Sequence, residues 1–125
     1  MKRTIRTIPL LALAALVLAT VACGGEPATV PESDIFITYE VGGTTDKASL
    51  TYENKDGNSE QKTVSVPWRF SFEAKPGAFL YVSAQNERES GSVTCKILEN
   101  NLVKGKAASE GAFVIAKCSR TAGED

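Results

Sequence analysis

The sequence contains no histidine, and only three cysteines, one tryptophan and one methionine occur in its 125 residues. Without histidine, the chain cannot form the Ser-His or Cys-His arrangements of nucleophilic catalysis, a histidine-ligated zinc site or a histidine general base. It also lacks a glycine-rich phosphate loop between a strand and a helix. We therefore expect no enzymatic activity, no cofactor and no bound metal.

Acidic residues outnumber basic residues after the first 22 residues. Lys2, Arg3 and Arg6 are three of the 14 basic residues, and the segment that holds them contains no acid. The remaining 103 residues carry 11 basic and 15 acidic residues, which gives them a net charge of −4. A mildly acidic domain without a basic patch does not neutralise a row of phosphates, so no nucleic acid partner is expected.

The first 22 residues have the pattern of a signal peptide. The basic residues are followed by the apolar run Leu10–Val21, which is shorter than the roughly 20 residues that a membrane-spanning helix needs. Ala22 and Cys23 end this segment in a sequence that resembles a bacterial lipobox, in which the cysteine receives diacylglycerol and becomes the new N-terminus. We predict a lipoprotein signal peptide over 1–22 and lipidation of Cys23. An ordinary secretory signal with an unrelated cysteine is the alternative.

The chain after the signal peptide divides into three parts by composition. Residues 23–33 hold the lipidated cysteine and a flexible linker rich in glycine and proline. Ten linker residues span at most roughly 35 Å, which would keep the domain close to the membrane. Residues 34–120 are expected to form one domain, and the acidic segment 121–125 is expected to be a disordered tail.

From Asp34 onward, apolar residues alternate with polar ones, which is the period of half-buried strands. Strands are predicted at 35–41, 48–52, 61–66, 68–73, 78–84, 92–98 and 112–118, with a further short run at 102–104. Asp56-Gly57 between the second and third strands predicts a tight hairpin turn. The aromatic residues Trp68, Phe70 and Phe72 alternate along the fourth strand, so we expect them to face the core.

Two alternating runs flank the polar segment Asn86–Gly91, and this pattern predicts a β-hairpin over Pro76–Ile97. The polar segments Gly42–Lys47 and Gly105–Gly111 are expected to be further loops. About seven short strands without a helical period predict an all-β fold, an antiparallel β-sandwich.

The odd number of cysteines suggests one modified cysteine and one disulfide. Cys95 and Cys118 both lie in predicted strands, and an exported chain meets an oxidising environment. We therefore expect a disulfide between them, with two buried free thiols as the alternative.

Two polar clusters invite a functional interpretation. The oxygen-bearing side chains of Asn54, Asp56, Asn58 and Glu60 alternate like part of a calcium loop, but they lack the 12-residue spacing and the flanking helices of an EF-hand. We expect a solvated hairpin turn there. The charged cluster at 87–89 is also expected to be a soluble turn, with a docking surface as the alternative.

Six segments occur in a specific order: Ile37–Val41, Ala48–Tyr52, Val66–Trp68, Pro76–Gln85, Ser90–Ile97 and Ile115–Ser119. With these segments the domain resembles the MmpS family, small accessory proteins of the mycobacterial MmpL transporters. The resemblance implies an extracytoplasmic, immunoglobulin-like β-sandwich with one disulfide, between Cys95 and Cys118. Typical MmpS proteins keep an uncleaved N-terminal transmembrane helix, whereas this chain has a short leader that ends at Cys23.

The resemblance further implies a role beside an RND-type membrane transporter that exports lipids, siderophores or drugs. Together with Cys23, it predicts an accessory protein held on the extracytoplasmic face of the cell membrane by an N-terminal lipid anchor. The alternative is a free-standing surface lipoprotein whose sandwich loops bind a lipid, a glycan or another envelope ligand.

Overall fold

The computed structural model describes residues 33–124 of the chain. These residues form eight strands and no helix: β1 (Ile35–Gly42), β2 (Lys47–Glu53), β3 (Ser59–Ser65), β4 (Trp68–Ala74), β5 (Phe79–Asn86), β6 (Ser92–Glu99), β7 (Leu102–Glu110) and β8 (Ile115–Thr121). Every strand pair is antiparallel. The predicted all-β class is confirmed, with eight strands in this part of the chain in place of about seven.

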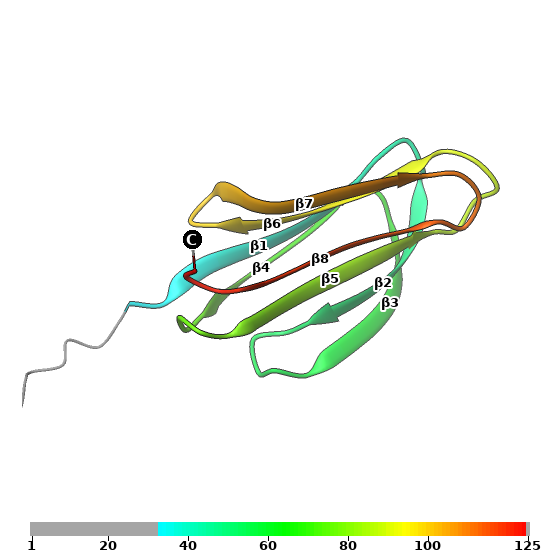
Figure 1. The fold of residues 1–125 in the computed structure, drawn as a ribbon. Helices are drawn as coiled ribbons and strands as arrows, with labels where there is room; N and C mark the ends of the chain where they lie inside the picture. Colours follow the sequence, from blue (N-terminus) through cyan, green and yellow to red (C-terminus); the bar gives the residue numbers. More distant parts are fainter. Residues whose placement is uncertain (1–32, 125) are drawn as a thin grey trace, which may run out of the picture. The chain divides into compact units, whose positions relative to one another are not determined.

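The strands form two four-stranded sheets that pack face to face (Figure 1). The first sheet has the order β4-β1-β6-β7, and the second has the order β3-β2-β5-β8. An immunoglobulin constant-type domain has the sheets ABED and CFG, in which the first two strands are neighbours. Here β1 and β2 lie in opposite sheets, so the observed strand order differs from that arrangement.

The two predicted hairpins had different outcomes. β2 pairs with β3 around the turn that contains Gly57, whose φ of 80° is the left-handed conformation that glycine tolerates, so this hairpin is confirmed. The hairpin over Pro76–Ile97 is wrong, because β5 and β6 belong to different sheets. Alternation around a polar turn is equally compatible with a crossover between facing sheets, since each strand buries one face in both arrangements.

The last third of the chain also differs from the prediction. Residues 105–111 were expected to form a loop, but β7 continues to Glu110 and pairs with β6 along its length. The final strand covers Ile115–Thr121 in place of 112–118. The sequence of β7 has low strand propensity, and pairing with a buried neighbour overrides that local preference.

The core consists of inward-facing side chains from both sheets. They are Ile37, Tyr39, Val41, Val93, Cys95 and Ile97 from the first sheet and Ala48, Leu50, Tyr52, Leu80, Val82, Ala84, Ala116 and Cys118 from the second. With Phe72, Ala74 and Ala122, these buried residues all lie between Ile37 and Ala122. This segment therefore closes its own core.

Tyr39 of β1 links the two sheets through its hydroxyl group. The hydroxyl donates a hydrogen bond to the carbonyl oxygen of Glu53 (2.8 Å) and accepts one from the backbone N–H of Tyr81 (3.2 Å). Both partners belong to the second sheet, beyond the point where the β2–β5 pairing ends at Tyr52 and Val82. Burial raises the pKa of Tyr39 to about 12, so the hydroxyl stays protonated and keeps its donor.

The three aromatic residues of β4 fill the side of the core where β3 and β4 form the sheet edges. Phe72 is buried, and Trp68 and Phe70 are partly buried against the core, as expected. The ring of Tyr52 lies 5.3 Å from that of Trp68 and 5.2 Å from that of Phe70, measured between centroids. These contacts join the edge strand of one sheet to β2 of the other.

Of the segment 121–125, which was expected to be a disordered tail, the structure describes residues 121–124, and these residues are tied to the fold. Thr121 ends β8, and Ala122 is only 1% exposed. Arg120 and Glu99 form a nearly buried ion pair (2.5 Å), and the second carboxylate oxygen of Glu99 accepts a hydrogen bond from the N–H of Gly123 (3.1 Å). The acidic composition of this segment predicted a free tail. The buried carboxylate of Glu99 instead holds the backbone at Gly123 in place.

Tyr39→Phe should lower the free energy of unfolding by about 1–3 kcal/mol. The reason is that the Glu53 carbonyl and the Tyr81 N–H lose their hydrogen bonds to the Tyr39 hydroxyl inside the sandwich. Urea denaturation followed by circular dichroism measures the change. Tyr81→Phe is the matched control, because it removes a hydroxyl from a less buried ring on the outer face of the second sheet. Equal stability of the Tyr39→Phe variant and the native protein would contradict the proposed link.

Candidate functional site

Three loops meet at one end of the sandwich, which we call the loop pole: residues 43–46, 87–91 and 111–114. The N–H of Gly111 donates to the carbonyl oxygen of Gly91 (2.9 Å), and the N–H of Thr45 donates to that of Ser92 (3.0 Å). The N–H of Phe113 donates to the carbonyl oxygen of Arg88 (3.2 Å). The two expected loops 42–47 and 86–91 therefore come together, and only the end of the expected loop 105–111 joins them.

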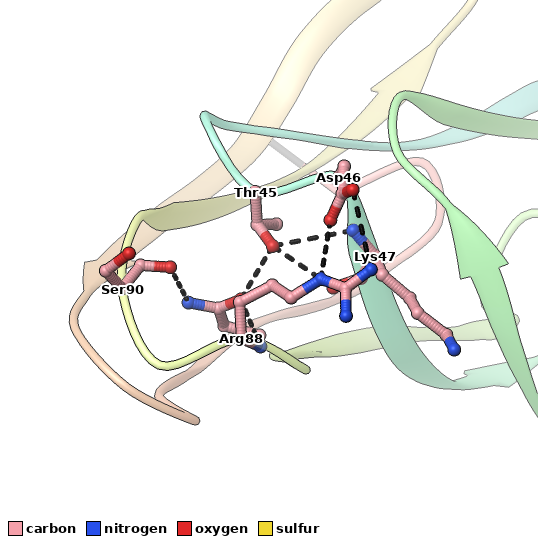
Figure 2. Close-up of polar contacts among 6 residues, drawn as sticks. Thr45, Asp46, Lys47, Arg88 and Ser90 are labelled. Carbon is pink, nitrogen blue, oxygen red and sulfur yellow. Dashed lines mark hydrogen bonds and ion pairs between the residues drawn. The ribbon is translucent and has the colours of Figure 1, made fainter.

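The side chain of Asn86 holds the three loops together from inside. Its oxygen accepts hydrogen bonds from the hydroxyl of Thr45 (2.6 Å) and the N–H of Arg88 (3.0 Å). Its nitrogen donates to the carbonyl oxygens of Ser90 and Gly111, each at 2.9 Å. Asn86 is fully buried, and these four bonds use the full capacity of a side-chain amide. Figure 2 shows the polar contacts around Thr45, Arg88 and Ser90.

Backbone geometry also requires a glycine next to this network. Gly43 has a φ of 118°, and an added Cβ would clash with the carbonyl group of Ser92. The chain leaving β1 therefore passes directly against the start of β6. This close approach lets the backbone N–H groups of Thr44 and Thr45 donate hydrogen bonds to Ser92, the first residue of β6.

An ion pair between Arg88 and Asp46 lies on the solvent side of the loop pole (Figure 2). The guanidinium Nε lies 2.8 Å from one carboxylate oxygen, and an Nη lies 3.5 Å from the other. The hydrogen bond from Arg88 lowers the pKa of Asp46 below its ordinary value of 3.8. Both side chains are more than half exposed, so the pair orients the guanidinium group more than it stabilises the fold.

Phe113 is an exposed aromatic residue in an uncommon backbone conformation. Its φ is 54° and it is 49% exposed, while its carbonyl oxygen accepts a hydrogen bond from the side chain of Gln85 (3.0 Å). Ile115, at the start of β8, is 53% exposed. The sequence did not reveal this exposed apolar pair, because its alternation placed both residues in one predicted strand at 112–118. A left-handed turn at Phe113 exposes them. Such a turn is usually predicted from a glycine, so a phenylalanine at this position gives no sequence signal for it.

A groove of about 420 Å³ opens where the first sheet meets the loop pole. It is lined by Trp68 and Pro67 together with the charged side chains of Glu40, Arg69 and Lys96. Arg69 and Glu40 form an ion pair across neighbouring strands (3.1 Å). A groove with the indole ring of Trp68 on one side and charged side chains at its edge suits a polar ligand that carries an apolar face.

The segment that resembled a calcium loop is the turn of the β2–β3 hairpin. The Asn54 side-chain oxygen accepts hydrogen bonds from the N–H groups of Asp56 (2.9 Å) and Asn58 (3.0 Å). Its nitrogen donates to the carboxylate of Glu60 (2.7 Å). The polar side chains thus stabilise the turn itself. Within residues 33–124, no group of three or more acidic or cysteine side chains is arranged to hold a metal ion.

Cys95 and Cys118 face each other across the core from β6 and β8. Both are buried free thiols in this structure, and the Sγ of Cys118 donates to the carbonyl oxygen of Cys95 (3.2 Å). Burial raises the pKa of both thiols, which disfavours a nucleophilic thiolate. The expected disulfide is not formed here and stays a prediction. The expected lipidation site, Cys23, lies outside the described residues.

Comparison with protein families gives a match to the family described as Mycobacterium membrane protein, over residues 26–122. The chain belongs to this family, the MmpS type. The match covers all eight strands and most of the segment between Cys23 and β1. A search of curated proteins gave no match. Among the described residues of this MmpS-type chain, no helix has the length and apolarity needed to cross a membrane.

The fold gives the MmpS-type segments distinct places. Ile37–Val41 and Ala48–Tyr52 supply the central strands β1 and β2, and Trp68 begins the aromatic edge strand. Pro76–Gln85 provides most of β5, which ends at Asn86, and Ser90–Ile97 provides most of β6. Most of the segments that carried the resemblance are thus core strands, whereas Phe113 lies between the last two of them.

In this MmpS-type protein, Asn86→Ala should lower the free energy of unfolding by roughly 2–4 kcal/mol, because several buried groups lose their hydrogen bonds. It should also speed amide hydrogen exchange at Arg88, whose N–H the Asn86 oxygen binds. Asn58→Ala is the control, since Asn58 is exposed in the β2–β3 turn. A variant with native stability and native exchange would show that the loops hold together without Asn86.

Protein isolated from the cell envelope should contain the Cys95–Cys118 disulfide and weigh two hydrogen atoms less than the reduced form. Reduction should then lower the free energy of unfolding by roughly 3 kcal/mol, because the bond closes a loop in the unfolded chain. Intact mass and denaturation with and without reductant provide the measurement. Both cysteines reacting with an alkylating reagent, after unfolding without reductant, would contradict the disulfide.

Proposed function

We propose that the protein is a lipid-anchored accessory protein of an RND-type, MmpL-like exporter, held on the extracytoplasmic face of the cell membrane. The observation that carries the proposal is the family match, which spans residues 26–122 and therefore all eight strands. MmpS proteins are associated with MmpL transporters. Under this proposal the protein acts by binding, without turnover, and the exporter moves a lipid, a siderophore or a drug.

The N-terminal sequence supports the anchor. Signal-peptide features precede Cys23, and β1 begins only 12 residues after that cysteine, at Ile35. A diacylglyceryl group on Cys23 would take the place of the transmembrane helix that typical MmpS proteins keep. The short connection would hold the domain beside a transporter in the same membrane.

The loop pole supports a protein partner. Its loops are joined by backbone hydrogen bonds and by the buried Asn86, so the surface is ordered before a partner arrives. Phe113 offers an apolar anchor of the kind that dominates binding energy, and Arg88 with its neighbouring acidic residues offers a polar rim. These features suit contact with the extracytoplasmic part of an exporter.

The second candidate is a free-standing surface lipoprotein that binds a lipid, a glycan or another envelope ligand. The groove beside Trp68 favours it, because an indole wall with Glu40 and Lys96 at the rim matches an amphipathic or carbohydrate ligand. The two candidates differ in one requirement. A ligand-binding module retains the ligand as a purified domain, whereas an adaptor needs its transporter.

Photo-crosslinking in intact cells should link a benzophenone side chain at Phe113 to one polytopic RND-type transporter. The same probe at Gln61, on the exposed face of β3, is the matched control and should give little of this product. Membrane purification and mass spectrometry identify the partner. A Cys23→Ala variant, which lacks the proposed lipid anchor, should lose this crosslinked product, because the anchor holds the domain beside the transporter.

Two results would contradict the adaptor proposal. One is the absence of a transporter at position 113 and at other positions of the loop pole. The other is recovery of envelope lipids or glycans alone, which would favour the binding module. Binding of the purified protein to such a ligand without an exporter would then decide for the second candidate.

A further inference from the structure

Four exposed apolar side chains lie at the end of the sandwich opposite the loop pole, with Phe36 on the outer face of the first sheet and Phe79 on that of the second. Six large apolar residues are exposed within residues 33–124, and the four at this end are Phe36 (40%), Phe79 (57%), Leu102 (63%) and Val103 (52%). We call this end the tether pole, because β1 begins there (Figure 1). It comprises residues 34–36, the β2–β3 turn at 54–58, and residues 75–79, 100–103 and 122–124.

Backbone hydrogen bonds fix one half of the tether pole. The N–H of Phe36 donates to the side-chain oxygen of Asn100 (3.1 Å), and the N–H of Asn100 donates to the carbonyl oxygen of Phe36 (2.8 Å). Asn100 and Asn101 have φ values of 51° and 69°, as in the two-residue turns that match strand twist. This turn joins β6 to β7, so Leu102 and Val103 lie at the same end of the first sheet as Phe36, with β6 between β7 and β1.

The end of the chain fixes the other half. The N–H of Gly77 donates to the carbonyl oxygen of Ala122 (2.9 Å), and the N–H of Ala122 donates to that of Ala78 (2.8 Å). These bonds place Phe79 at the same end, where its ring stacks on that of Tyr81 with centroids 6.2 Å apart. The exposed rings and aliphatic chains therefore sit on an ordered frame rather than on loose loops.

Charges of both signs surround these apolar side chains. Lys75 lies 3.4 Å from Asp34, and both are exposed. Lys104 is exposed after Val103, and Glu73 is exposed on β4. Since the charges are mixed, contact with another surface would rely on the apolar side chains. The lysine chains would reach polar headgroups around such a contact.

The chain between Cys23 and the tether pole decides what can cover this surface. A contact between this pole and the bilayer rests on the proposed lipid anchor at Cys23. Ten residues, 24–33, connect that cysteine to Asp34, and ten residues span at most roughly 35 Å. The lipid surface is therefore always within reach of the tether pole, at the high effective concentration that a short tether provides. Even a weak apolar contact is then occupied.

We propose that the tether pole rests on the lipid bilayer, with Phe36, Phe79, Leu102 and Val103 in the interfacial region. An anchored domain with four apolar side chains at its anchored end lowers its exposed apolar area by this contact. The loop pole then lies on the order of 25 Å from the membrane, the length of an eight-residue strand such as β5. The contact orients the domain toward the extracytoplasmic part of its partner.

Tryptophan fluorescence in vesicles tests the proposal. The acylated chain is reconstituted into phosphatidylcholine vesicles with and without brominated acyl chains, which quench indole rings at the membrane. Phe79→Trp and Leu102→Trp place the probe at the tether pole, and Phe113→Trp places it at the loop pole with similar exposure. The native Trp68 lies beside the loop pole and gives a constant background.

The two tether-pole variants should lose most of their added emission in brominated vesicles, and the loss should persist in high salt. The Phe113→Trp variant should keep its emission. If vesicle-bound Phe79→Trp and Leu102→Trp variants keep their emission as Phe113→Trp does, the proposal is overturned. An emission loss that disappears in high salt would overturn the apolar contact as well.

A separate measurement shows whether Cys23 is acylated. If it is not, mass spectrometry finds an N-terminal peptide without acyl chains, and the protein does not float with the vesicles. The tether pole is then tested with residues 24–125, which contain the complete core, bound through an N-terminal hexahistidine to nickel-chelating lipids. Quenching at positions 79 and 102 in this form supports the bilayer contact without the anchor. Unquenched probes overturn it.

Discussion

The hydroxyl group of Tyr39 is the contact on which the packing of the two sheets depends. The side chain of Tyr39 extends from the first sheet across the core. Its hydroxyl group bridges Glu53 and Tyr81 at the point where β2 and β5 separate, in place of a direct hydrogen bond between these two strands. A buried tyrosine is favourable only when its polar end finds partners, and here the second sheet supplies both a donor and an acceptor. This requirement fixes how the sheets sit on each other.

Polar anchors then fix the two ends of the sandwich. At the loop pole, the amide of Asn86 satisfies groups from three loops, so hydrogen bonds to one buried side chain hold this irregular backbone together. At the tether pole, the ion pair of Glu99 and Arg120 holds the end of the chain. Asn86 and Glu99 are buried and their side-chain polar atoms are hydrogen-bonded, and any packing that left these groups without partners would be costly.

The two ends suggest a division of tasks for an MmpS-type protein. The loop pole carries Phe113 and an oriented guanidinium group, a combination that suits a protein partner. The tether pole carries apolar side chains within ten residues of a predicted lipid anchor at Cys23, a combination that suits a membrane. A contact with the membrane at one end and a free binding surface at the other are compatible with the accessory role that we propose.

Sequence alone determined the class of fold, the faces of the strands and the family, because alternation and local motifs are properties of neighbouring residues. It placed Trp68 and Phe72 correctly toward the core and predicted the β2–β3 turn at Gly57. It did not determine which strands pair, and it wrongly made β5 and β6 a hairpin. The role of Asn86 and the exposure of Phe113 were decided only by the tertiary structure, since their partners lie up to 41 residues away along the chain. Alternation says which face is buried, whereas the partner of a strand or of a polar side chain depends on how the whole chain closes.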